Sequence, residues 1–148
     1  MPTLSRWFLK GGCVCLAIGA LAGTLILVHK GTGRFPTLWI LLPAHTYLMV
    51  VGGISQCAMG VCYWILPQFE EGKSGGVTWL AWGSYATLNG AIVLIACHPL
   101  LQVLLGASAA TIAFRGAGML QGVAALAFVL HIWPCLRPSS STPCRGPS

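Results

Sequence analysis

The chain has 148 residues, of which 56% are hydrophobic and only 7% are charged. Its mean hydropathy of +0.81 excludes an ordinary soluble domain, in which about a quarter of the residues carry a charge. The net charge of +6 does not require a nucleic-acid partner, because basic residues commonly flank the helices of membrane proteins.

Long stretches without charge indicate membrane-spanning helices, since about 20 apolar residues cross a bilayer core. The stretch 74–114 is too long for one span and should break at His98-Pro99, because proline ends a helix. The sequence therefore predicts an all-α fold, an integral membrane four-helix bundle. We expect a lead at 1–10, a transmembrane domain at 11–136 and a disordered tail at 137–148. The predicted spans are roughly 11–29, 36–67, 77–98 and 107–134.

The first predicted helix could be mistaken for a signal peptide, because Arg6 and Lys10 precede its apolar run. The run is longer than the apolar region of a usual signal peptide, and no small-residue cleavage site leads into a soluble sequence. Gly19 and Gly23 instead have the four-residue spacing of packed membrane helices. These features favour a helix that is retained.

The distribution of Lys and Arg predicts the orientation of the bundle. Two basic residues flank the spans on one side, Lys30 and Arg34. The other side carries five, Arg6, Lys10, Lys73, Arg137 and Arg145. By the positive-inside rule both termini should lie in the cytoplasm.

The second predicted helix holds most of the candidate site residues. Pro43 lies inside this span and should loosen the backbone just before His45. The face of His45 combines a possible metal ligand with glycines that let a flat group come near the backbone. On a 3.6-residue helix this face holds His45, Met49, Gly52, Gly53, Gln56 and Gly60.

Arg115 is the one charged residue within a predicted span. Gly118 and Gly122, which follow it, have the four-residue spacing of small residues that pack between membrane helices. At about 1.5 Å per residue, Arg115 and His45 both lie roughly 10–15 Å in from the outer surface. No Asp or Glu of the chain lies in a span. Arg115 therefore either reaches toward the surface or binds an anion from a ligand, a lipid or another subunit.

The segment AHTYLMVVGGISQCAMGVCYWILPQF, residues 44–69, resembles small membrane proteins related to haem–copper oxidase subunit I. In the large oxidases, a histidine in the second helix ligates the low-spin haem about a third of the way in from the outer face. His45 matches that histidine in helix number, direction and depth. Gly52 and Gly60 match the small positions after it, and Tyr63 and Pro67 match the end of the helix.

The resemblance implies a b-type haem and electron transfer in respiration, in a prokaryotic cytoplasmic membrane. His45 would be an axial ligand, Met49 and Gly52 would line the site, and Arg115 would pair with a propionate. The second ligand would be His98, or a second copy of His45 across a two-fold axis. The implied partners are the lipid bilayer and either further copies of the chain or a respiratory partner subunit.

The chain also departs from this family. The oxygen-reducing centre of that family needs three histidines around copper and another on the high-spin haem iron. This chain has four histidines in total, and none of them forms an H-x-H or other paired arrangement within a helix. We therefore do not expect oxygen reduction by this chain alone.

Each candidate residue also has a structural interpretation. A single histidine in a span can simply bind a neighbouring carbonyl or a tyrosine, and spaced glycines commonly serve helix packing. Under that interpretation the chain is a haem-free accessory or assembly subunit of a respiratory complex.

Two other classes of four-helix membrane protein fit poorly. Thiol oxidoreductases use reactive cysteine pairs, but none of the seven cysteines forms a C-x-x-C motif, and most should be packing residues. Small multidrug transporters typically couple transport through a carboxylate within the membrane, which no span of this chain contains.

Overall fold

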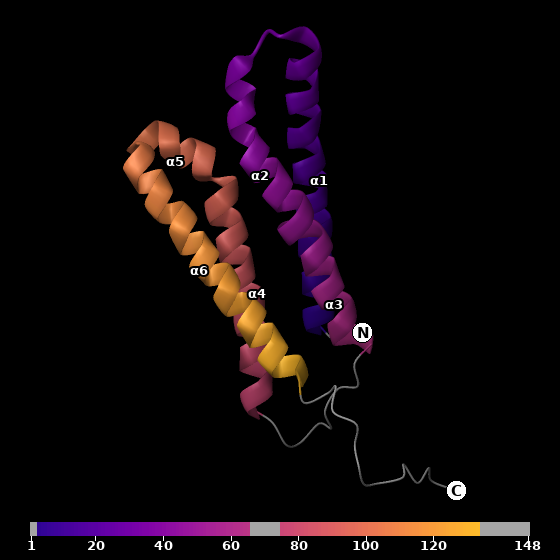
Figure 1. The fold of residues 1–148 in the computed structure, drawn as a ribbon. Helices are drawn as coiled ribbons and strands as arrows, with labels where there is room; N and C mark the ends of the chain where they lie inside the picture. The colour runs from indigo at the N-terminus through magenta and orange to yellow at the C-terminus, as the bar shows by residue number, and fades with distance from the viewer. Residues whose placement is uncertain (1–2, 66–74, 134–148) are drawn as a thin grey trace, which may run out of the picture.

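The computed structural model describes residues 3–65 and 75–133, and every element in them is helical. The first hairpin pairs α1 with a continuous second arm built from four short segments, and the second hairpin pairs α4 with α6 through α5 (Figure 1). The elements are α1 Thr3–Thr32, η1 Pro36–Leu41, α2 Leu42–Tyr47, η2 Leu48–Ser55, α3 Gln56–Ile65, α4 Gly75–Ala96, α5 His98–Leu105 and α6 Ala107–Ile132.

The four long helical stretches of the described residues agree with the predicted spans. Each is long and apolar enough to cross a membrane. The predicted acidic loop with Glu70 and Glu71, and the predicted tail at 137–148, lie outside the described residues. The four stretches are Thr3–Thr32, Pro36–Ile65, Trp79–Ala96 and Ala107–Ile132.

Helix α1 packs against the second arm through residues spaced alternately three and four apart. This spacing keeps one seam facing a partner helix in a left-handed pair. Gly12 and Gly19 on the seam let the two backbones approach closely, as small residues do between membrane helices. The buried residues of α1 are Ser5, Phe8, Gly12, Cys15, Gly19, Ile26 and His29.

The second arm is not one regular α-helix. It begins as a 3₁₀-helix, becomes α-helical at Leu42, and is a π-helix over Leu48–Ser55. Its seam toward α1 is spaced mostly by four, a step that overshoots an α-helical turn by about 40° because a turn takes 3.6 residues. The wider π-helical turns offset this drift and keep the seam on α1. The buried residues of the arm are Ala44, Leu48, Gly52, Gly53, Gln56, Gly60 and Tyr63.

The second hairpin is held by alanines of α6 that recur at every seventh position. Ala110, Ala117 and Ala124 are at most 1% exposed, and Ala117 packs against Ala91 and Ile95 of α4. Because a methyl group occupies little space, these alanines let α6 lie close along α4.

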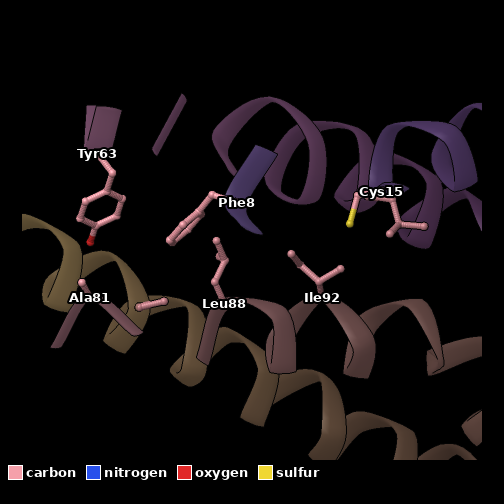
Figure 2. Close-up of a cluster of buried hydrophobic side chains, with 8 residues drawn as sticks. Phe8, Cys15, Tyr63, Ala81, Leu88 and Ile92 are labelled. Carbon is pink, nitrogen blue, oxygen red and sulfur yellow. The ribbon is translucent and has the colours of Figure 1, made fainter. Parts of the chain in front are cut away.

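A core of apolar side chains joins the two hairpins. Phe8 and Cys15 of α1 and Tyr63 of α3 face the side chains of α4 (Figure 2). The rings of Phe8 and Tyr63 lie 5.4 Å apart between centroids, within the range of favourable aromatic pairs. The residues of α4 in this core are Ala81, Leu88 and Ile92.

Two boundaries differ from the sequence prediction. Helix α1 begins at Thr3 rather than at residue 11, because Ser5 and Phe8 continue its buried seam into the predicted lead. The predicted break at His98-Pro99 is present as a turn at Cys97. However, the connection after it forms the helix α5, since Pro99 stands in the first turn, where proline is tolerated. Gly106 then reverses the chain with a φ of 86° that favours glycine.

We expect Gly60→Leu to destabilise the first hairpin by about 1–3 kcal/mol, the usual cost of overpacking. A Cβ at Gly60 would lie 2.9 Å from Cβ of Phe8, which cannot move without shifting α1. Unfolding of the purified protein in mixed micelles by a denaturing detergent measures the change. The control is Gly83→Leu, where a Cβ meets nothing within 4 Å. Equal stabilities of the two variants would contradict the close approach at Gly60.

Candidate functional site

His45 lies in the short helix α2 and binds the backbone of α1. Its Nδ1 lies 2.7 Å from the carbonyl oxygen of Gly19. Because a carbonyl can only accept, Nδ1 carries a proton and donates this hydrogen bond to Gly19. Gly23 lies directly beneath the ring, since a Cβ there would lie 2.5 Å from Cε1 of His45. The position of the imidazole thus depends on two glycines of α1.

The glycine face next to His45 is filled by side chains of α1. A Cβ on Gly52 would lie 2.8 Å from Cβ of Cys15, and one on Gly53 would overlap Leu16. Met49 packs against Gly19, where a Cβ would lie 3.0 Å from its sulfur. These glycines therefore bring α1 close to the second arm, which is the packing role given above as the alternative to cofactor approach.

His98 and Arg115 belong to the second hairpin. His98 is the first residue of α5, and its ring meets that of Phe114 edge-on at 5.6 Å between centroids. Arg115 lies on an exposed face of α6. Among the described residues, no hydrogen bond, ion pair or ring contact joins His45 to His98 or to Arg115.

The residues expected to hold haem make their contacts in different hairpins. His45 contacts α1, whereas His98 contacts Phe114 on α6, and the glycines beside His45 face Cys15 and Leu16 instead of an open space. In the described part of the chain, no three side chains of His, Cys, Asp or Glu gather to hold a metal ion. The glycine face beside His45 is thus covered by α1, and a haem held by His45, His98 and Arg115 stays a prediction.

The remaining histidines lie near the ends of helices. His29 is buried, its Nδ1 accepts the backbone N–H of Phe35 at 3.1 Å, and its ring meets Trp39 edge-on. His131 packs its ring against Tyr63 at 5.3 Å between centroids. His29 therefore fixes the turn between the two arms of the first hairpin, and His131 joins α6 to α3.

Polar side chains tie the two hairpins together within the apolar stretches. The hydroxyl of Tyr47 donates to Oε1 of Gln121 at 2.6 Å, and Nε2 of Gln56 donates to Oδ1 of Asn89 at 3.3 Å. Gln56 is fully buried, and Asn89 in turn donates to the carbonyl oxygen of Tyr85. Such bonds between apolar helices contribute to their association.

Gln56 was expected on the face of His45, but its pairing with Asn89 and the pairing of Tyr47 with Gln121 were not predicted. The signal was available, because Gln56, Asn89 and Gln121 are uncharged polar residues deep within apolar stretches. Such residues usually face another helix, since an unpaired amide is costly in an apolar medium. Which of them would pair could not be read from spacing alone.

Comparison with known proteins assigns no family to the chain. No family model, no curated protein and no solved structure matches it. The similarity to haem–copper oxidase subunit I therefore stays a prediction from residues 44–69.

A double-mutant cycle of Tyr47→Phe and Gln121→Leu should give a coupling energy of about 0.6 kcal/mol and at most about 1.7 kcal/mol, as measured for hydrogen bonds between membrane helices. Detergent-induced unfolding of the four proteins provides the energies. The control cycle pairs Tyr47→Phe with Gln102→Leu, an exposed residue of α5, and should show no coupling. Additive effects in both cycles would contradict the bond between Tyr47 and Gln121.

Proposed function

We propose that the chain is an integral membrane protein that serves as a haem-free accessory subunit of a larger membrane complex. The observation that supports this most is the contact of α1 with the face of His45, where Cys15, Leu16 and the carbonyl of Gly19 occupy the positions that a cofactor would need. Four long apolar helical stretches support membrane insertion. The excess of Lys and Arg at one end of the spans supports cytoplasmic termini.

The polar residues of the apolar stretches also fit an accessory subunit. The imidazole of His45 and the amides of Gln56 and Gln121 bind groups of neighbouring helices. In this role they fix which helices pair and in which register. The assignment of the complex to respiration rests on the similarity to subunit I alone.

A second candidate is binding of a low-spin haem b by two copies of the chain. The hydrogen bond from Nδ1 of His45 to Gly19 favours it, because histidines that ligate metals commonly hold Nδ1 in this way and present Nε2. Bound between two copies of His45, the haem would supply one-electron transfer. In this candidate a single copy supplies one ligand only.

The visible spectrum of the protein purified in mild detergent, reduced minus oxidised, tests the proposal. We expect no haem bands, even after haem is added. His45→Ala should leave the spectrum unchanged and lower the stability by about 0.6 kcal/mol, the average contribution of a hydrogen bond between membrane helices. His98→Ala is the control, since His98 makes no hydrogen bond with the described residues.

A haem spectrum that depends on His45 would contradict the proposal. Sharp low-spin bands that disappear in His45→Ala but persist in His98→Ala would overturn the proposal in favour of the two-copy haem protein. A colourless protein that migrates at the size of a monomer, when it is extracted from its own membranes and analysed by native electrophoresis, would also count against an accessory subunit.

A further inference from the structure

Helix α6 carries a second seam, made of Arg115 and small residues, on the side turned away from Ala110, Ala117 and Ala124. Its members are spaced alternately three and four apart, and all are exposed. A Cβ on Gly118 or on Gly122 would meet nothing within 4 Å. Ile112 and Met119, which are 70% and 75% exposed, rise along one edge of this seam. The outward seam, as we call it, consists of Ser108, Thr111, Arg115, Gly118, Gly122 and Ala125.

At two other places in the molecule, regularly spaced small residues are covered by a neighbouring helix. On α1 the seam with Gly12 and Gly19 holds the second arm, and on α6 the seam with Ala110 and Ala117 holds α4. Lipid-facing surfaces of α1 are different, since they present large apolar side chains such as Leu21 and Leu27. The outward seam therefore has small residues in common with these helix contacts, although large side chains of α6 such as Leu126 are also exposed beside it.

Arg115 adds a charge to this seam that nothing in the described residues neutralises. It makes no hydrogen bond or ion pair there. Arg115 lies eight residues after Ala107, about 12 Å along the helix from its start. A charge at that depth is costly, and it usually pairs with an opposite charge.

The described parts of the chain, 3–65 and 75–133, contain no Asp or Glu that could pair with Arg115. The two acidic residues of the chain, Glu70 and Glu71, precede α4, which begins at Gly75. Ala117, near Arg115, packs against Ala91 and Ile95, which lie about 24–30 Å along α4 from Gly75. The five residues from position 70 to Gly75 span at most about 18 Å.

A second copy of the chain is also a poor occupant of the outward seam. Two copies in the same orientation that crossed at Gly118 and Gly122 would bring their Arg115 side chains to the same two-fold axis. Like charges repel strongly in an apolar medium. Charge complementarity instead requires a helix that carries a carboxylate.

We propose that the outward seam of α6 binds a transmembrane helix of a partner protein that carries Asp or Glu at the depth of Arg115. This proposal rests on the proposed function, because it names the kind of partner that an accessory subunit would join. The carboxylate pairs with the guanidinium through two parallel hydrogen bonds. Gly118 and Gly122 let the two backbones come close enough for this contact.

Energy transfer in lipid vesicles tests the proposal with defined probes. The full-length protein supplies its tryptophans as donors, and the acceptor is a dansyl group on a synthetic Leu/Ala helix of about 20 residues. One peptide carries a single Asp placed about 12 Å from the outer end, and the matched peptide carries Leu there. We expect the Asp peptide to bind about tenfold more tightly than the Leu peptide, from the strength of polar contacts between model membrane helices.

Variants separate the roles of charge and seam. Arg115→Leu should remove the preference for the Asp peptide, and Arg115→Lys should keep part of it. Gly118→Ile should weaken binding of the Asp peptide at least tenfold although Arg115 is intact. Gly90→Ile is the control, because a Cβ on Gly90 of α4 also meets nothing within 4 Å, and this variant should bind like the parent.

Equal affinity for both peptides would overturn the proposal. If a lipid phosphate neutralises Arg115 instead, both peptides should bind equally, and their affinity should change with the anionic lipid content of the vesicles. Failure of the proposed function looks different, since haem bands that require His45 would overturn that function and leave the peptide result untouched. A colourless protein that binds both peptides equally would overturn the proposed partner of the outward seam and leave the proposed function standing.

Discussion

Close contact between α1 and the second arm depends on glycines that remove side-chain volume from both surfaces, and the rest of the structure is built on this contact. Gly12 and Gly19 on α1 face Cys57 and Met49, while Gly52 on the second arm faces Cys15. In an apolar medium helices gain little from burying apolar surface, so close packing and polar contacts must hold them together. Glycines supply the packing, because each lets a side chain of the partner helix reach the backbone.

The π-helical segment of the second arm also serves the close contact with α1. Seam residues spaced by four, such as Leu48, Gly52 and Gln56, would rotate away from α1 in a regular α-helix. The wider turns keep them on α1, and His45, in the segment just before these turns, also contacts α1 through the carbonyl of Gly19. The position of the one candidate ligand in this arm therefore follows from the packing of the hairpin.

Much of the fold could be predicted from charge and hydropathy, but the site could not. The break near His98 followed from Pro99, and the four long helical stretches followed from runs without charge. The shared face of His45, Gly52 and Gln56 was also predicted, yet spacing along one helix does not reveal whether a cofactor or another helix covers that face. Nor does hydropathy distinguish Gly118, which is open, from Gly60, which is covered by Phe8. These differences depend on which helices become neighbours.

The polar groups of the apolar stretches differ in how they are satisfied, and this difference bears on what the molecule does. Tyr47 and Gln121 bind each other, and His45 binds α1, so these contacts are complete within one chain. Arg115 is the only charged side chain inside a predicted span, and it faces outward beside small residues. These neutral pairs hold the hairpins together, whereas the guanidinium of Arg115 lies on an open helix face, where a deep charge is costly unless an opposite charge meets it. That cost is the physical reason for the proposed partner helix with a carboxylate.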